Sequence, residues 1–400
     1  MRGCDILKCI TDRTWAEIDL DKLEYNYNQF SSIINTKSTK IMAIVKANAY
    51  GHGSIDASKL FEALGAGYLG VAALDEALEI RNSGVQTPIL ILNHASSERN
   101  FQIVGNNVTS TIFSTEQALL LNDTAKSLNK TAKVHVKVDT GMTRVGVNFE
   151  DAANFVQQLS NYTHLEVEGL FTHFSTASDY SLYDQDNSFV ELQFKRYMQV
   201  IDTLKSLGIH IPLKHVCNSG AAINYPHMHL DMIRPGISLY GYYNSVEVEE
   251  CKLDLQQPMT VKSQIIRLNS VESGVHVGYG RTFTTKRKSL LATIPVGYAD
   301  GFSRTLSGKV SALVNGEFAP IVGTICMDQC VIDVTDMTTD LKIGTEVVVL
   351  GCQGDKTILA EDLGNLMGTI SHEILCMISR RVPRKYIQKD KPSYLQNYLI

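Results

Sequence analysis

The chain has 400 residues, of which 44% are hydrophobic and 20% are charged, which is ordinary for a globular protein large enough to form two domains. Its formal net charge of -5 provides no basic footprint, which argues against nucleic acid as a partner. No apolar run approaches a membrane span, and Lys8, Asp12 and Arg13 interrupt the apolar N-terminal residues before a signal-peptide core could form. The eight cysteines are scattered without a CxxC pair, so we expect reduced thiols, a cytoplasmic location and no metal site.

The first part of the chain alternates strand-like and helix-like segments. Apolar runs predict strands at 41–45, 68–72, 88–92, 110–113, 133–138, 166–171, 213–217 and 232–239. Helical patterns lie between them at 56–64, 75–83, 116–129, 151–159 and 191–207. Strand followed by helix predicts parallel strands with helical crossovers, and about eight such units favour a TIM (β/α)8 barrel over an open sheet.

The residue composition and pattern of the sequence change after residue 255. Runs rich in Val, Ile and Thr, broken by glycine, occur at 289–296, 310–314, 330–334 and 346–351. Such runs are typical of a β domain. We therefore expect a barrel domain over residues 15–254 and a mainly β domain over 255–400, on which residues 1–14 also pack.

The segment 43–53, AIVKANAYGHG, places one lysine directly after a buried strand. A lysine becomes a nucleophile where burial or neighbouring cations lower its pKa. Gly51 and Gly53 let the backbone turn and approach a ligand closely. Lys46 is therefore a candidate catalytic amine, although by pattern alone an ordinary surface lysine remains the alternative.

Other polar residues follow the predicted strands. They are Lys137, Asp139 and Arg144 after the fifth strand, His173 after the sixth, Asn218 and Ser219 after the seventh, and Arg234, Gly236 and Ile237 at the eighth. Each has a structural explanation by itself, such as a helix cap or a surface charge. Because active sites of these barrels lie where strands end, we expect the residues to share one rim.

The motif VKANAYGHG, with Lys46 and Tyr50, resembles the pyridoxal-phosphate signature of the alanine racemase family, and matching segments recur in order from Trp15 to Arg384. The resemblance implies pyridoxal 5'-phosphate as cofactor, carried covalently by Lys46. It also implies that Tyr50 and Ser219 bind the phosphate. Backbone N–H groups near helix starts at Gly236 and Ile237 suit the same anion.

The resemblance assigns further roles on the rim. Arg234 matches the arginine that faces the pyridine nitrogen, His173 the residue against the ring, and Arg144 the residue that reaches the phenolic oxygen and the substrate carboxylate. An arginine keeps its proton at physiological pH, so the ring nitrogen stays unprotonated and the cofactor is a weaker electron sink, which favours proton exchange over transamination. The remaining expected cofactor contacts are Asn218 and His372.

The β domain carries a second chemical signal in VGYGRTF, residues 277–283. Racemisation needs a base on each face of the substrate, and Lys46 serves only one. Tyr279 resembles the opposite base, contributed by the second subunit of a homodimer; a tyrosine packed at a β turn is the alternative. Met327 in TICMDQ resembles a backbone contact to the substrate carboxylate, and Tyr298 in PVGYADGFSR an entrance residue.

Two positions raise questions about modification and specificity. Lys137 matches a family lysine that is often carbamylated, with an unmodified lysine paired to Asp139 as the alternative. His372 stands where the family usually carries a tyrosine, and a more polar group there suits a substrate hydroxymethyl group. Thr324 replaces a basic residue often found at the outer entrance.

We therefore expect a racemase that interconverts L- and D-alanine by a two-base mechanism and supplies D-alanine for peptidoglycan. A serine racemase or a dual serine and alanine racemase is the alternative substrate class. A non-catalytic barrel that carries the cofactor would not need Tyr279 or the β domain, and a related decarboxylase would need an acid in place of Arg234.

Two other motifs are not expected to be functional. GAGYLG, residues 65–70, fits a dinucleotide fingerprint but follows a helix and precedes a strand, which reverses the required order. HMHLD, residues 227–231, has no second cluster of metal ligands and is interpreted as an exposed connection.

Overall fold

The computed structural model describes residues 13–177, 189–243 and 253–399. Contacts divide the chain into two units. The barrel unit comprises Leu23–Ala49 and Ser54–Gln256, and the β unit comprises the described residues up to Lys22, Tyr50–Gly53 and the chain from Gln257 onward. Most of the N-terminal segment expected to pack on the β domain, residues 1–12, lies outside the described residues.

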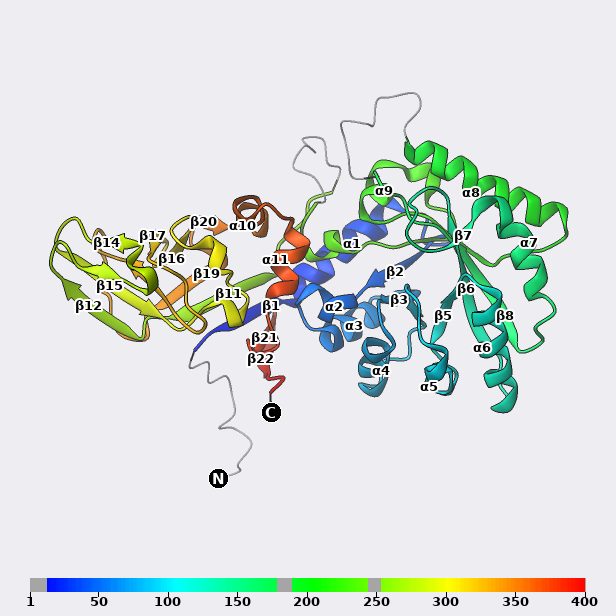
Figure 1. Cartoon of the computed structure of the whole chain (residues 1–400), viewed down its shortest axis with the longest axis horizontal. Helices are drawn as coiled ribbons and strands as arrows, with labels where there is room; N and C mark the ends of the chain where they lie inside the picture. Colours follow the sequence, from blue (N-terminus) through cyan, green and yellow to red (C-terminus); the bar gives the residue numbers. More distant parts are fainter. Residues whose placement is uncertain (1–12, 178–188, 244–252, 400) are drawn as a thin grey trace. The chain divides into compact units, whose positions relative to one another are not determined.

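Eight parallel strands form the barrel, in the order β10-β2-β3-β4-β5-β6-β8-β9. Figure 1 labels β2, β3, β5, β6 and β8 of this set. They are β2 (Lys40–Ile44), β3 (Tyr68–Val71), β4 (Ile89–Ile91), β5 (Thr109–Ile112), β6 (Ala132–Asp139), β8 (Leu165–Phe171), β9 (Leu213–His215) and β10 (Met232–Ile233). The backbone N–H of Asp231 donates to Lys214 O at 3.1 Å, and that of Arg234 to Cys217 O at 2.9 Å. These bonds join the last two strands to each other, so the predicted TIM barrel is confirmed.

The helices of the barrel unit lie between its strands in the sequence. They are α3 (Ser54–Ala63), α4 (Leu74–Asn82), α5 (Asn100–Gly105), α6 (Thr115–Ser127), α7 (Phe149–Leu159), α8 (Phe189–Ser206) and α9 (Ser219–Asn224), and α1 (Leu20–Ile33) precedes them. Helix α7 illustrates why these segments form helices that pack on the barrel. Its apolar residues recur at helical spacing and are buried, namely Ala152, Phe155, Val156 and Leu159. Within the described ranges, no helix is long and apolar enough to cross a bilayer.

The predicted strand at 232–239 is wrong in its second half. Strand β10 ends at Ile233, and the 3-10 helix η4 (Ile237–Tyr240) follows. Pro235 has no backbone N–H to continue a ladder, and Gly236 turns the chain into η4. The exposed connection expected at 227–231 is also partly wrong, because His229 is buried and its Nε2 lies 2.8 Å from Ala222 O.

The β unit contains a mainly antiparallel sheet in the order β12-β15-β18-β17-β16-β19-β11-β1-β21-β22. Its strands are β1 (Trp15–Asp19), β11 (Met259–Gln264), β12 (Arg267–Val271), β15 (Ser289–Ile294), β16 (Ser311–Val314), β17 (Glu317–Val322), β18 (Cys330–Asp333), β19 (Glu346–Gln353), β21 (Arg384–Gln388) and β22 (Lys391–Gln396). Strand β1 pairs with β11 and β21 in this sheet, although the expected barrel domain starts at Trp15. The mainly β character predicted for the C-terminal part is confirmed.

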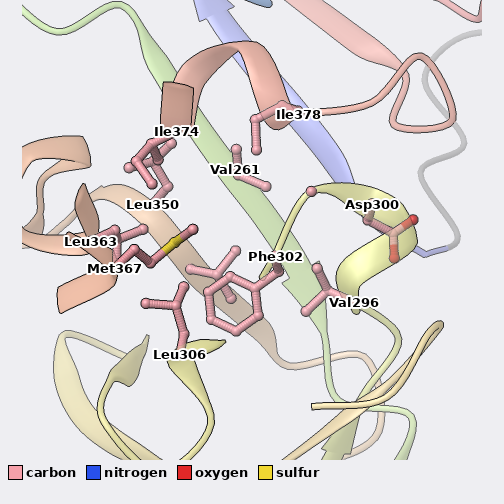
Figure 2. Close-up of a pocket in the computed structure, with 12 residues that line it drawn as sticks. Val261, Val296, Asp300, Phe302, Leu306, Leu350, Leu363, Met367, Ile374 and Ile378 are labelled. Carbon is pink, nitrogen blue, oxygen red and sulfur yellow. The ribbon is translucent and has the colours of Figure 1, made fainter. Parts of the chain in front are cut away.

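Two short helices pack on this sheet, α10 (Ala360–Met367) and α11 (Ser371–Met377). Figure 2 shows the apolar pocket between them and the strands, with Val261 of β11, Leu350 of β19, Leu363 of α10 and Ile374 of α11 among its lining residues. Burial of these aliphatic side chains holds α11 against the sheet. His372 is therefore carried on an element that the core of the β unit fixes.

Candidate active site

Lys46 begins a strained turn directly after β2. The helix-like segment α2 (Lys46–Tyr50) is left-handed, with φ of 53° at Ala47, 55° at Asn48 and 52° at Ala49. For residues other than glycine, this conformation costs about 1–2 kcal/mol per residue. Such a turn persists only where its surroundings hold it.

Glu76, in the first turn of α4, holds the turn. Its Oε1 accepts a hydrogen bond from Ala47 N at 2.6 Å, and its Oε2 accepts from Ala72 N at 2.7 Å. The Asn48 Oδ1 accepts from Ser54 N at 2.9 Å. Sequence reasoning missed Glu76, although an acid in the first turn of a predicted helix is a known capping signal that could have drawn attention to it.

Positive charge gathers around Lys137, which lies near the end of β6. The side chain is buried, with 5% of the residue exposed. Burial lowers the pKa of Lys137 to about 8, and the charges of Arg144, Arg234 and Lys46 act in the same direction. Burial and the same cations hold the pKa of His173 well below its usual value. The predicted residues Lys46, Lys137, Arg144, His173 and Arg234 therefore lie close enough for their charges to affect one another's ionisation.

Arg234 follows β10 and is 4% exposed. Its Nη2 donates to Thr172 O at 2.8 Å and to Val216 O at 3.0 Å, and its Nη1 lies 3.0 Å from His215 Nδ1. Burial lowers the pKa of Arg234 to about 10, which leaves it a cation at neutral pH. These three partners therefore hold the positively charged guanidinium in one orientation.

Two helix starts meet beside Arg234. Ser219 is the first residue of α9, and its Oγ accepts from Gly236 N at 2.8 Å. Ile237 begins η4 and is buried. The Asn218 side chain caps α9 by accepting from Ala221 N at 3.0 Å, so its observed role is structural. The Ser219 hydroxyl hydrogen and the N–H groups at these helix starts suit an anion, which would share Gly236 N–H with Ser219 Oγ or replace that oxygen as its acceptor.

In the β unit, Tyr50 and His372 lie near each other. Tyr50 is buried, which raises the pKa of its hydroxyl, and its ring centroid is 5.9 Å from that of His372. A Cβ on Gly51 would meet Leu375 O at 2.2 Å, so only glycine fits beside α11. The fully buried Arg384 also fixes this segment, because its Nε donates to Gly51 O at 2.9 Å.

Three predicted residues share one exposed region of the β unit. Tyr279 is 70% exposed, Met327 52% and Tyr298 40%. Thr324 Oγ1 donates to Tyr279 O at 2.9 Å, and Ala299 N donates to Met327 O at 3.0 Å, so hydrogen bonds tie the three segments together. Gly278 and Gly280, each at φ 71°, form the turn that presents Tyr279.

The residues present fit pyridoxal phosphate by their chemistry. A primary amine at Lys46 suits the aldehyde, and a buried cation at Arg234 suits an unprotonated pyridine nitrogen. Ser219 and the neighbouring N–H groups suit the phosphate. These features define a class of enzymes in which a lysine after one strand of a parallel barrel binds pyridoxal phosphate. The barrel is followed by a β domain, and other cations surround the lysine.

Comparisons with known proteins identify the family within that class. The model of the alanine racemase N-terminal domain matches residues 18–244, and that of the C-terminal domain matches residues 258–386. The chain belongs to the alanine racemase family. It is 42% identical to an alanine racemase of Clostridium tetani over 96% of this chain and 98% of that protein.

Solved structures agree with this assignment. An alanine racemase of Clostridium difficile is 39% identical, with a TM-score of 0.93 over 98% of this chain and 100% of that chain. One from Bacillus anthracis with bound L-Ala-P is 33% identical, with a TM-score of 0.89 over 96% and 98% of the two chains.

Proposed function

We propose that the protein interconverts L- and D-alanine with pyridoxal phosphate held by Lys46. The observation that carries this proposal is the group of interacting cations Lys46, Lys137 and Arg234, which lie at or near strand ends of the barrel. The chain as a whole matches alanine racemases over nearly their full length. These relatives do not favour serine as the substrate, and the exposed Tyr279 and the β domain oppose a purely cofactor-carrying role.

Each residue has a task in this reaction. When bound, pyridoxal phosphate withdraws electrons from the bond between the α carbon of the amino acid and its hydrogen. The Lys46 amine exchanges the proton on one face, and the phenol of Tyr279 exchanges it on the other. Arg234 keeps the pyridine nitrogen unprotonated, which limits electron withdrawal and favours return of the proton to carbon. His173 would lie against the ring of the bound cofactor, as the family resemblance implies.

Binding tasks fall to other residues. Arg144 and the backbone at Met327 hold the substrate carboxylate. Lys137, in its carbamylated form, is negatively charged and orients the Arg144 guanidinium. Ser219, Gly236, Ile237 and Tyr50 hold the phosphate, with Asn218 supporting α9 and His372 beside Tyr50. Tyr298 stands at the entrance. The family resemblance assigns Tyr279 to the active site of a second copy, and its 70% exposure is compatible with that role, so the protein works as a cytoplasmic homodimer.

A direct assay tests this function. The purified protein, loaded with pyridoxal phosphate, is given L-alanine, and D-alanine is followed by chiral chromatography, with L-serine as the comparison substrate. We expect alanine to be racemised in both directions, and its product to serve peptidoglycan synthesis. If neither direction of alanine racemisation exceeds the rate with free pyridoxal phosphate, the proposed function is wrong.

A further inference from the structure

A line of buried polar side chains runs through the barrel interior from Arg234 to Glu168. Arg234 Nη1 lies 3.0 Å from His215 Nδ1, and His215 Nε2 lies 2.9 Å from His135 Nδ1. His135 Nε2 in turn lies 3.4 Å from Glu168 Oε2. The line thus connects the residue beside the proposed cofactor ring to a carboxylate on β8.

Hydrogen-bond chemistry gives this line one direction. Arg234 can only donate, so His215 Nδ1 accepts and its Nε2 carries the hydrogen. His135 Nδ1 then accepts, and the His135 Nε2–H donates to Glu168. Burial lowers the pKa of both histidines, which are therefore neutral. Burial raises the pKa of Glu168, but hydrogen bonds from His135, Lys133 and Tyr68 outweigh it and bring the value to about 2.

The surrounding backbone makes room for these rings. A Cβ on Gly169 would lie 2.5 Å from His135 Nδ1, so the residue next to Glu168 must be glycine while this ring is in place. The register between β6 and β8 shifts at Val134/His135, the position where the ring enters the barrel. Phe171 stacks on His215 with ring centroids 4.9 Å apart and planes 4° apart. Both ring positions are therefore specified by neighbouring residues.

Arg234 needs such a connection because it is a buried cation. Its other partners are the carbonyl oxygens of Thr172 and Val216 and the His173 ring. Carbonyl dipoles offset the desolvation of a cation only in part, and a buried charge is usually paired. Glu168 is the carboxylate to which its hydrogen bonds lead, and Lys133 at 2.6 Å from Glu168 Oε1 keeps that carboxylate ionised.

We propose that Glu168 is a positioning residue for Arg234, whose guanidinium it holds in one orientation by fixing the hydrogen positions on His135 and His215. The inference rests on the proposed function only in that Arg234 faces the cofactor. Without the charge of Glu168, the two rings can reverse their hydrogens, and His215 then presents an N–H toward Arg234. That arrangement displaces the guanidinium and weakens its control over the ring nitrogen.

The test is Glu168→Gln, which keeps the shape and an acceptor oxygen but removes the charge. In holoenzyme labelled with nitrogen-15 in its histidine rings, we expect wild type to show Nε2–H forms for both residues. We expect Glu168→Gln to show mixed or reversed forms, and kcat to fall about tenfold with KM nearly unchanged, as for loss of other indirect supports. Glu166→Gln removes an exposed charge two residues earlier on the same strand and should match wild type in both measurements.

A second variant covers the case in which Glu168→Gln does not fold. His135→Phe keeps a ring in the space but removes the acceptor for His215, so the His215 signals should lose the single Nε2–H form. The inference is overturned if the His215 ring signals of either folded variant equal those of wild type. It is also overturned if Glu166→Gln changes the His135 and His215 signals as much as Glu168→Gln does. The outcomes stay separable from the proposed function, which fails only if wild type does not racemise alanine.

Discussion

The two units organise their proposed active-site residues in opposite ways. In the barrel unit, Arg234 and Lys137 are 4% and 5% exposed, and Arg234 is held by hydrogen bonds within its own unit. In the β unit, Tyr279 and Met327 are 70% and 52% exposed. Large exposed apolar side chains that gather in one region commonly mark an interaction surface. One chain therefore buries the barrel residues by itself, whereas in the proposed homodimer the exposed β residues would be covered by a second copy.

The barrel side of the comparison depends most strongly on Lys46. We expect Lys46→Ala to lower racemisation by at least about a thousandfold in both directions, because the amine supplies proton transfer as well as cofactor attachment. Borohydride reduction of wild type should fix pyridoxal phosphate on the Lys46 peptide. Lys40→Ala, at the start of the same strand, is the control and should remain active. Recovery of the label on another lysine would refute the assignment.

The β side is tested by Tyr279→Phe, which removes one hydroxyl from an exposed residue. We expect racemisation to fall by about 10²–10³-fold while the absorbance of the bound cofactor is retained. Co-refolding equal amounts of Lys46→Ala and Tyr279→Phe chains should restore about a quarter of wild-type activity, because half of the dimers would contain one site with both residues. Mixtures as inactive as either parent would show that Tyr279 does not act across subunits.

Glu76 tests whether the Lys46 turn is held from within the barrel unit. Glu76→Gln weakens the hydrogen bond from Ala47 N, so we expect unfolding free energy to fall by about 1.5–3 kcal/mol. Racemisation should fall about tenfold, because the lysine loses its fixed position. Asp75→Asn, the neighbouring and more exposed acid in the same helix turn, serves as control. Equal losses in both variants would contradict a specific role for Glu76.

Lys137 offers a pH-dependent test. Burial, with neighbouring cations, lowers the pKa of its amine to about 8, so the amine is almost fully protonated at pH 6 and mostly neutral at pH 9. Carbon dioxide reacts with the neutral form. We therefore expect carbon-13 bicarbonate to give a protein-bound carbamate signal that grows from pH 6 to pH 9. The signal should vanish in Lys137→Ala, and the racemisation rate of this variant should fall by no more than about tenfold. A wild-type spectrum without this signal would remove the hypothesis.

Sequence reasoning was most successful for features with a regular period. Apolar runs and helical patterns predicted the barrel, because parallel strands are buried on both faces and their crossovers are amphipathic. Individual residues at strand ends could also be located, and Lys46, Lys137 and Arg234 do share one electrostatic neighbourhood. Their assigned roles came from resemblance and remain predictions.

Other features depend on contacts that have no period. Glu76 supports the Lys46 turn from 29 residues away, and His135 meets His215 across 80 residues. Neither pair carries a motif. A strand histidine that hydrogen-bonds to a distant residue has the same local sequence as one that only packs in the core. The second half of the predicted strand at 232–239 failed because a proline and a glycine end the ladder inside an otherwise apolar run.

The smallest expected effect concerns His372, which lies in the β unit and is only half-buried. Its ring is near that of Tyr50, and α11 is fixed by the apolar pocket of Figure 2. A tyrosine at this position would bring a hydroxyl and a longer ring beside Tyr50. We expect His372→Tyr to change kcat/KM for alanine by less than about tenfold, since one side chain supplies roughly 1–3 kcal/mol of discrimination.

The direction of that effect distinguishes two roles for His372. If its imidazole leaves space for a hydroxymethyl group, His372→Tyr lowers kcat/KM for serine more than for alanine. If it only supports Tyr50 at the phosphate, the mutation changes the affinity for pyridoxal phosphate and leaves the ratio of serine to alanine unchanged. We expect the second result, because the relatives are alanine racemases and the His372 ring has Tyr50 as a neighbour. A ratio shifted more than about threefold toward alanine would assign His372 to substrate choice, since that change exceeds about 0.6 kcal/mol.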